Sequence, residues 1–254
     1  MTNDNLKISI ITVCLNSEKF IEKTIESVIN QTYSNIEYII IEGKSTDNTL
    51  NILNKYKPDI DILISEKDNG IYDAMNKGLN LAHGDFIYFL NSGDYLYDKD
   101  TLAKIITHVN DQNKYDIIYG DFIYFDENKS EYREGHPSVT EIVARGVNHQ
   151  SILVPKMSFE KFGYFDDTYK IFADLDWILR AVIKNKQKIN YIKLPIAYYL
   201  EGGMSEKYYN KYLFEKNEIM KKYVSLNQFL KFAVYYPREF LIYVKDNTLN
   251  LFQA

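Results

Sequence analysis

An apolar run that ends in a small acidic turn constrains the fold of this chain more than any other feature. The run is Phe86 to Leu90, and the turn that follows is Asn91-Ser92-Gly93-Asp94. A short continuous apolar run is typical of a strand that is buried on both faces of a sheet. Such a strand cannot hold a charge inside the sheet, so Asp94 is expected at the surface, beyond the strand's carboxyl end. Open α/β sheets bind ligands at this edge, which makes Asp94 a candidate ligand-binding carboxylate.

Strand and helix patterns alternate through the first hundred residues. Further strand candidates are 7–13, 37–41 and 61–65, and each precedes a polar stretch and then apolar residues at helical spacing. Gly84 is predicted to end the helix that comes before the Phe86 strand. This alternation predicts an α/β fold in which a mostly parallel sheet is flanked by helices.

Composition sets outer limits on the function. The chain has 254 residues, of which 46% are hydrophobic, enough for one large α/β domain with a small appendage. Its formal net charge of −5 argues against a nucleic-acid partner. The single cysteine, Cys14, excludes an internal disulfide and predicts core packing in a reducing compartment. The chain shows no signal pattern and no run of ~18 apolar residues, so we expect a cytoplasmic protein.

Four segments, taken in order and at their spacing, resemble the family 2 glycosyltransferases with the GT-A fold. They are 9–16, 42–49, 68–78 and 91–94. The third segment is similar to one common in the branch that builds bacterial exopolysaccharide, of the colanic-acid type. The resemblance covers about the first 200 residues. It implies transfer of a sugar, with inversion, from a nucleotide-diphosphate sugar to an acceptor hydroxyl, in the synthesis of capsule, O-antigen or exopolysaccharide.

The resemblance also implies which residues contact the donor. The backbone of Thr12 and Val13, with Asn16 nearby, is expected against the nucleotide. Glu42 is expected at the base or ribose, where a carboxylate accepts hydrogen bonds, although the family usually has Asp there. Asp68 resembles a family residue near the nucleotide, and helix capping is the alternative explanation for it.

The metal site implied by the resemblance is the turn 91–94, at the position of the family's Asp-x-Asp. Here Ser92 and Asp94 stand where many relatives have two acidic residues. Mg²⁺ or Mn²⁺ is often held by one or two carboxylates together with substrate phosphates, so one Asp is compatible with a site completed by the donor. His149 follows in a segment that lines the site in relatives; the alternative is a structural histidine.

Asp174 is the candidate catalytic base. Leu175, Ile178 and Leu179 form one apolar helical face, which places Asp174 in the first turn and Asp176 on a different side. Asp176 has Arg180 four residues on as an ion-pair partner. Asp174 has no such local partner and matches the second residue of the family's Glu-Asp pair, with Ala173 in place of the Glu. The alternative is an Asp favoured by the helix dipole.

The predicted organisation is a GT-A domain over 1–205, divided into a nucleotide-sugar half (1–98) and an acceptor half (99–205). A helical extension rich in aromatic residues and lysine is predicted over 206–254. Two interpretations of this extension stay open. It lies on the inner face of the membrane, where a lipid-linked saccharide acceptor would be found, or it packs on the domain or on a second subunit.

Two other functions compete with transfer to a saccharide acceptor. A non-catalytic protein that binds nucleotide sugars, or a scaffold of the same fold, would explain Ala173 and the incomplete acidic motif. A sugar-nucleotide pyrophosphorylase would also be α/β and metal-dependent. It is expected to have a Gly-rich phosphate loop after the first strand, and the turn Cys14 to Glu18 contains no glycine.

Overall fold

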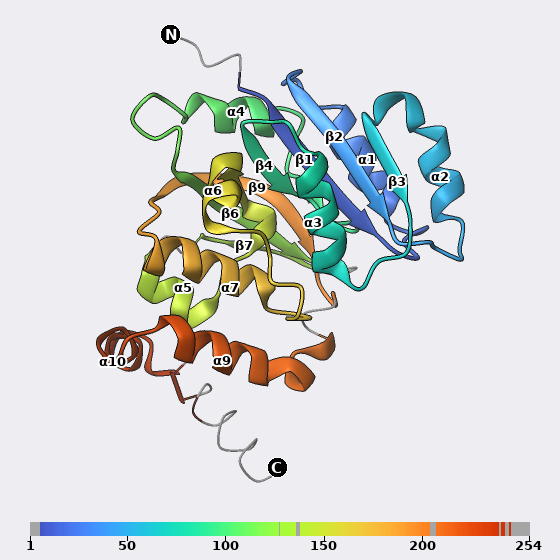
Figure 1. Ribbon diagram of the computed structural model, residues 1–254. Coiled ribbons are helices and arrows are strands. Elements are labelled where there is room, and N and C mark those ends of the chain that lie inside the picture. Colours follow the sequence, from blue (N-terminus) through green and yellow to red (C-terminus); the bar gives the residue numbers. More distant parts are fainter. Residues whose placement is uncertain are drawn as a thin grey trace.

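The computed structural model describes residues 6–126, 128–135, 138–203, 207–238, 240, 241 and 244 (Figure 1). Their strands form one nine-stranded sheet in the order β3-β2-β1-β4-β8-β6-β9-β5, and β7 pairs with β6. Helices cover both faces of the sheet. The predicted α/β architecture is therefore confirmed.

The four strands predicted from the first hundred residues are all present and mutually parallel. Alternate side chains of β1 enter two different cores, because successive residues of a strand point to opposite faces. Ile8 and Ile10 pack in one core with Ile21 and Ile25 of α1, while Ile11 packs in the other core. The elements of this half are β1 (Ile8–Cys14), α1 (Ile21–Ile29), β2 (Ile36–Glu42), α2 (Thr49–Lys55), η1 (Lys57–Asp59), β3 (Ile62–Ser65), α3 (Ile71–Leu81) and β4 (Phe86–Phe89).

Beyond β4 the sheet becomes mixed. β8 runs antiparallel between β4 and β6, β9 is parallel to β6, and β5 is antiparallel to β9. The elements are β5 (Tyr95–Leu96), α4 (Thr101–Thr107), β6 (Ile117–Phe125), β7 (Ser130–Arg133), α5 (Val139–Arg145), η2 (His149–Ser151), β8 (Ile152–Pro155), α6 (Lys156–Phe162), α7 (Ala173–Leu179), η3 (Arg180–Lys184) and β9 (Ile189–Leu200). This half brings η2, the start of α7 and the end of β9 to the carboxyl end of β4.

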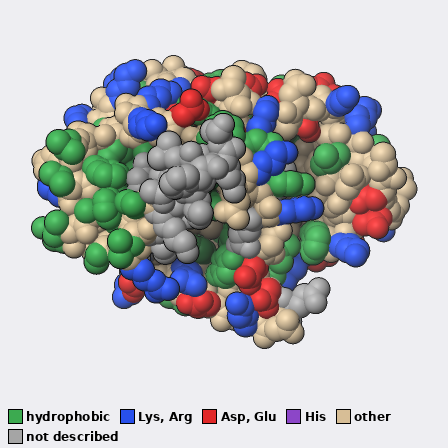
Figure 2. Space-filling model, turned by 90° about the horizontal axis from the view of Figure 1, so that it is seen from below, with side chains coloured by type: hydrophobic (Ala, Val, Ile, Leu, Met, Phe, Trp, Pro, Cys, Tyr) green, Lys and Arg blue, Asp and Glu red, His purple; other side chains and the backbone are tan. Residues whose placement is uncertain are grey.

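The C-terminal helices pack on the rest of the chain. After η4 (Asn210–Tyr212), α9 (Leu213–Tyr223) and α10 (Leu226–Tyr235) lie below the sheet, next to α7 and α5 (Figure 1). Ile219, Met220 and Phe232 are buried in the same core as α3 and α7. The outer side of α10 is apolar. Figure 2 shows the molecule from below, with apolar side chains gathered at one end of this lower surface. No helix in the described part of the chain is both long enough and apolar enough to span a membrane.

Gly84 has a different role from the one predicted. The last residue of α3 is Leu81 and its C-cap is Ala82, so Gly84 does not cap the helix. A Cβ at Gly84 would lie 2.5 Å from the Ser9 backbone nitrogen and 2.9 Å from the Lys7 carbonyl oxygen. The Gly84 N–H donates to Ser9 Oγ at 2.8 Å. Glycine is therefore required because the loop before β4 approaches the backbone of β1 closely.

We expect Gly84→Ala to lower the free energy of unfolding by roughly 1–3 kcal/mol, since the new methyl group meets backbone rather than a movable side chain. Gly203→Ala is the matched control, because its Cβ would meet only Tyr199 Oη, at 3.6 Å. Urea unfolding of both variants measures the difference. Equal stability of the two variants would contradict the packing role of Gly84.

Candidate active site

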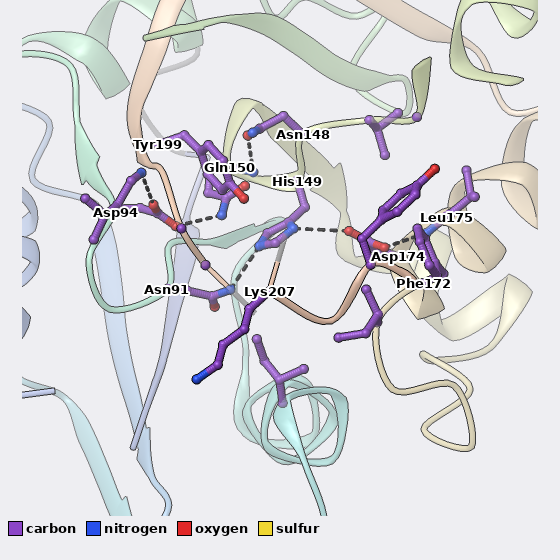
Figure 3. A pocket seen from close by; sticks show the side chains of 18 of the residues that line it. Asn91, Asp94, Asn148, His149, Gln150, Phe172, Asp174, Leu175, Tyr199 and Lys207 are labelled. Atoms are coloured by element: carbon purple, nitrogen blue, oxygen red, sulfur yellow. Dashed lines mark hydrogen bonds and ion pairs between the residues drawn. The ribbon is translucent and has the colours of Figure 1, made fainter. Parts of the chain in front are cut away.

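A cavity of about 980 Å³ lies beyond the carboxyl end of β4 (Figure 3). It is lined by the turn after β4, by η2, by the start of α7, by the end of β9 and by residues that precede and begin α9. Four of the predicted site residues share this cavity: Ser92, Asp94, His149 and Asp174.

Asp94 is buried, so the prediction of a surface carboxylate is wrong. Only 5% of the residue is exposed, because the ends of β9 and η2 cover it. Its Oδ1 accepts a hydrogen bond from the Leu200 backbone at 2.9 Å, and its Oδ2 accepts one from Gln150 Nε2 at 2.6 Å. Burial raises the pKa of Asp94 to about 6, against the opposing effect of these two hydrogen bonds.

The residues around Asp94 fit a hard divalent cation. Within the described residues, Asn91 Oδ1 and Ser92 Oγ are buried and have no hydrogen-bond partner. Both are oxygen atoms of the kind that Mg²⁺ and Mn²⁺ prefer, and both belong to the turn that carries Asp94. The described chain has no cluster of three His, Cys, Asp or Glu side chains suited to a metal ion. A cation here would therefore need further oxygen ligands from a bound phosphate or from water.

Asp174 lies in the first turn of α7 and receives three hydrogen bonds. Tyr72 Oη donates to Oδ1 at 3.1 Å, and the Leu175 backbone N–H donates to the same oxygen at 2.8 Å. His149 Nδ1 lies 3.2 Å from Oδ2. The side chain is 19% exposed, so it is accessible from the cavity.

His149 connects Asp174 to the turn after β4. Its Nε2 lies 2.9 Å from Asn91 Nδ2. An amide nitrogen only donates, so Nε2 accepts and the ring proton is on Nδ1, from which it is donated to Asp174. His149 thus has a structural role and lines the cavity at the same time.

Consecutive residues of η2 contact the two carboxylates, as Figure 3 shows. His149 contacts Asp174, and Gln150 contacts Asp94. Asn148 begins the turn, and its side chain accepts a hydrogen bond from the Gln150 N–H at 3.2 Å. The sequence analysis found His149 but missed Gln150, whose contact spans 56 residues.

Glu215 of α9 is a second residue that the sequence analysis missed. It is 2% exposed and accepts backbone hydrogen bonds from Lys170, Ile171 and Phe172 at 2.8, 3.0 and 3.3 Å. The single hydroxyl proton of Tyr72 is shared between the Ile171 carbonyl at 2.6 Å and Asp174 Oδ1 at 3.1 Å. The segment that leads into α7 is therefore held from two sides. A signal was present, because Glu215 lies four residues before the buried Ile219 and so on the same helix face.

Asp176 has the ion pair predicted from its spacing. Its Oδ2 lies 3.6 Å from Arg180, and the residue is 1% exposed. A second partner was not foreseen: Lys222 of α9 lies 2.9 Å from Oδ1. Asp176 therefore joins α7 to α9 and does not line the cavity.

The predicted nucleotide contacts lie outside this cavity. They occupy the carboxyl ends of β1, β2 and β3. Thr12 is buried and donates its hydroxyl to the Leu90 carbonyl at 2.7 Å, while the Val13 carbonyl accepts from the Ser92 N–H at 3.3 Å. These two residues hold the turn after β4 in place.

Asn16, Glu42 and Asp68 belong to connected loops beside these strand ends. Asn16 has a positive φ of 50° and accepts from the Thr46 N–H at 2.9 Å. Glu42 is buried, and burial raises its pKa, but hydrogen bonds from Ser65 and Ser45 outweigh that effect and lower the pKa below its ordinary value. A Cβ at Gly43 would lie 2.5 Å from Asp68 Oδ2. The Asp68 side chain therefore lies against Gly43, which follows Glu42 in the sequence.

The α/β sheet and the acidic residues at its carboxyl edge fit glycosyltransferases with the GT-A fold, and comparison with known proteins identifies this class. Residues 9–172 match the family model described as glycosyl transferase family 2. The chain belongs to this family.

Three similar proteins illustrate the relationship. A PGL/p-HBAD biosynthesis glycosyltransferase of Mycobacterium bovis (strain BCG / Pasteur 1173P2) is 32% identical over 203 residues, 78% of each chain. A putative teichuronic acid biosynthesis glycosyltransferase of Bacillus subtilis (strain 168), TuaG, is 37% identical over 107 residues, 41% of this chain and 42% of that one. A mannosyltransferase of Pyrobaculum calidifontis, solved with GDP-Man and Mn²⁺, has a TM-score of 0.69 at 12% identity over 98% of this chain and 76% of that one. That likeness shows the fold.

The raised pKa of Asp94 makes the stability of the folded chain depend on pH. The pKa in the folded chain, about 6, is above the ordinary 3.8, so ionisation of Asp94 costs stability. We expect the free energy of unfolding of the native chain, relative to Asp94→Asn, to fall as pH rises from about 4 to about 6. Chemical unfolding of both proteins across this range measures the difference.

Metal binding should show the opposite pH dependence, because a cation needs the ionised carboxylate. With UDP or GDP present, Mn²⁺ affinity should fall about tenfold per pH unit below about 6, and Asp94→Asn should abolish it at all pH values. Isothermal titration calorimetry measures this. Retained Mn²⁺ affinity in Asp94→Asn would remove Asp94 from the metal site.

Proposed function

We propose that this chain is an inverting glycosyltransferase that moves a sugar from a nucleotide-diphosphate sugar to an acceptor hydroxyl, in the synthesis of a bacterial surface polysaccharide. The observation that carries the proposal is the pair Asp94 and Asp174, two carboxylates on one cavity held by neighbouring residues of η2. The names of the relatives, one in teichuronic acid biosynthesis, support a surface glycan as product.

In the proposed reaction Asp174 accepts the proton of the acceptor hydroxyl as that oxygen attacks the anomeric carbon. The bond from the anomeric carbon to the diphosphate oxygen breaks on the opposite side, so the configuration inverts. Tyr72, His149 and the Leu175 N–H orient the carboxylate. The ring of His149 also fixes the distance between this base and the turn that holds the donor.

The donor diphosphate is assigned to the turn 91–94. Asn91 Oδ1, Ser92 Oγ and Asp94 would hold Mn²⁺ or Mg²⁺, which when bound neutralises the charge of the departing nucleoside diphosphate. The presence of Mn²⁺ and GDP-Man in a structural neighbour supports this assignment. Asn16 and Asp68 reach solvent and are assigned to the nucleotide, with the backbone of Thr12 and Val13 behind them. Glu42 is assigned to ordering that loop, since it is fully buried.

The two competing functions fit less well. A pyrophosphorylase needs a glycine-rich phosphate loop after β1, and here Asn16 occupies the left-handed position of that turn. A scaffold protein has no use for the buried oxygens of Asn91 and Ser92 that lack partners in the described chain, since each costs free energy without a ligand.

Asp174 and Asp176 provide the test of the proposed base. Asp174→Asn keeps the size of the side chain but removes the proton acceptor, so transfer should fall roughly 10²–10⁴-fold with donor affinity almost unchanged. Transfer is measured with the donor found by a thermal-shift screen of UDP-, GDP- and dTDP-sugars. An active Asp174→Asn variant would overturn the assignment.

Asp176→Asn serves as the matched variant. Its carboxylate is 1% exposed and has two cationic partners, so the variant should lose about 3 kcal/mol of stability rather than activity. This is a larger loss than the single Arg180 pair suggested. Assays are therefore run well below its melting temperature, where kcat should stay near that of the native chain.

We further propose that α10 contacts an anionic membrane surface that presents a lipid-linked acceptor. Leu226, Leu230 and Val234 repeat every four residues and are 74%, 55% and 72% exposed, which gives one apolar stripe (Figure 2). Lysine and arginine outnumber glutamate between residues 207 and 238, although the whole chain is acidic. An apolar stripe with neighbouring basic residues is typical of a helix in the membrane interface.

The triple variant Leu226→Ser, Leu230→Ser and Val234→Ser should bind phosphatidylglycerol vesicles at least about tenfold more weakly, because apolar burial drives interfacial binding. Tyr115→Ser is the control, since Tyr115 is 56% exposed elsewhere on the surface. Vesicle co-sedimentation measures both. If native protein ignores vesicles and the triple variant instead changes oligomeric state in light scattering, the stripe is a contact between subunits.

A further inference from the structure

The cavity carries a group of lysines in addition to the carboxylates of Asp94, Asp174 and Glu201. Lys170, Lys207 and Lys216 line it, and in the described part of the chain none of the three has a carboxylate within ion-pair distance; Lys170 Nζ donates to the Asp167 carbonyl at 3.1 Å. Arg145 lines the cavity as well, and the carboxylates of Asp94, Asp174 and Glu201 face the same space. The three lysines therefore add positive charge to the cavity wall without ion-pair partners in the described residues.

Two of these lysines lie on the same side of the cavity as Asp174. Glu215 accepts a hydrogen bond from the Lys170 backbone, and Lys216 is the next residue of α9, so both lysines flank one buried contact. Lys216 Nζ also donates to Tyr209 Oη at 3.3 Å. The Tyr209 ring in turn meets the Phe172 ring edge to face, with centroids 5.7 Å apart. Phe172 stands only two residues before Asp174.

Aromatic rings and ammonium groups thus form one wall beside the proposed base. Aromatic faces pack against the C–H surfaces of sugars, and a lysine ammonium binds an oxyanion as a point charge. The donor diphosphate has its own assigned position at the turn 91–94, and His149 lies between this turn and Asp174. A second anion near Asp174 would therefore belong to the acceptor.

We propose that Lys170 and Lys216 bind an oxyanion of the acceptor, a phosphate or a sugar carboxylate, while Phe172 and Tyr209 pack against its sugar ring. This inference rests on the proposed function, since it takes Asp174 to act on the acceptor. It narrows the acceptor from any saccharide to an anionic one. Lys207 also lines the cavity and is labelled next to Asn91 in Figure 3. It is assigned to the donor and not to the acceptor.

Binding of small anions to the full chain tests the proposal without any turnover. The probes are sn-glycerol 3-phosphate, glucuronate and the neutral methyl glucoside, titrated by isothermal titration calorimetry first without and then with saturating UDP and Mn²⁺. We expect at least one anion to bind in the millimolar range and methyl glucoside to bind at least roughly tenfold more weakly. Which anion binds more tightly distinguishes a phosphate from a carboxylate acceptor.

The double variant Lys170→Gln and Lys216→Gln should weaken anion binding by roughly tenfold, because each charge pair near the surface contributes only modestly. Lys211→Gln with Lys221→Gln is the matched control, since these lysines belong to the same segment but do not line the cavity. The control pair should bind the anion like the native chain. Thermal melting checks that both double variants are folded.

Three results would overturn the proposal: no anion binding, equal anion affinity of the two double variants, or displacement of the anion when UDP and Mn²⁺ are added. The last result would assign the lysines to the donor diphosphate. Asp174→Asn should keep its anion affinity. A fully active Asp174→Asn variant with intact anion binding would rule out Asp174 as the base without affecting the proposed oxyanion site. Failure of the proposed function and failure of the proposed oxyanion site are therefore distinguishable.

Discussion

One turn of 3-10 helix, η2, fixes the relation between Asp94 and Asp174, two carboxylates that line this cavity. His149 contacts Asp174 and Gln150 contacts Asp94, so the separation of the proposed base and the proposed metal ligand is set by adjacent residues of one backbone. The turn is itself anchored, because Tyr88 of β4 donates its hydroxyl to the Gln150 carbonyl at 2.7 Å. The carboxylates come from segments 80 residues apart in sequence, and without η2 no described contact would set their spacing. Preorganisation of this kind is what a displacement reaction requires.

The turn after β4, residues 91–94, contains buried polar groups whose unfavourable burial a ligand can offset. Asp94 is ionised at neutral pH although burial raises its pKa to about 6, and Asn91 Oδ1 and Ser92 Oγ lack partners in the described chain. A divalent cation with a diphosphate would satisfy all three groups at once. The cost of burying them would be offset when donor and metal bind together, and this predicts weak metal affinity in the absence of a nucleotide.

The sequence predicted the parts of the fold that depend on local periodicity. Alternating strand and helix patterns located β1 to β4 and the helices between them, and the Asp174 and Asp176 sides of α7 followed from helical spacing. Burial of a side chain by residues that are distant in sequence was not predictable in this way. Asp94 was expected at the surface because its own strand ends there, yet it is buried by Leu200 and Gln150, which are 106 and 56 residues away. Gly84 was predicted to cap a helix. Its close approach to Ser9, 75 residues away, cannot be recognised from the local sequence.

The C-terminal helices pack on the domain, which is one of the interpretations that the sequence left open, but the residues that make these contacts were not predicted. Glu215 of α9 accepts three backbone N–H groups just before α7, and Lys222 of the same helix pairs with Asp176 in the first turn of α7. The Glu215 contacts hold the segment that leads into Asp174, so α9 acts as a positioning element for the proposed base, whereas the Lys222–Asp176 pair stabilises the packing of α9 on α7. Truncation before Tyr208 would remove these contacts together with the apolar stripe of α10. Loss of activity after truncation would therefore say nothing about a membrane, whereas substitutions confined to Leu226, Leu230 and Val234 leave the supports of Asp174 in place.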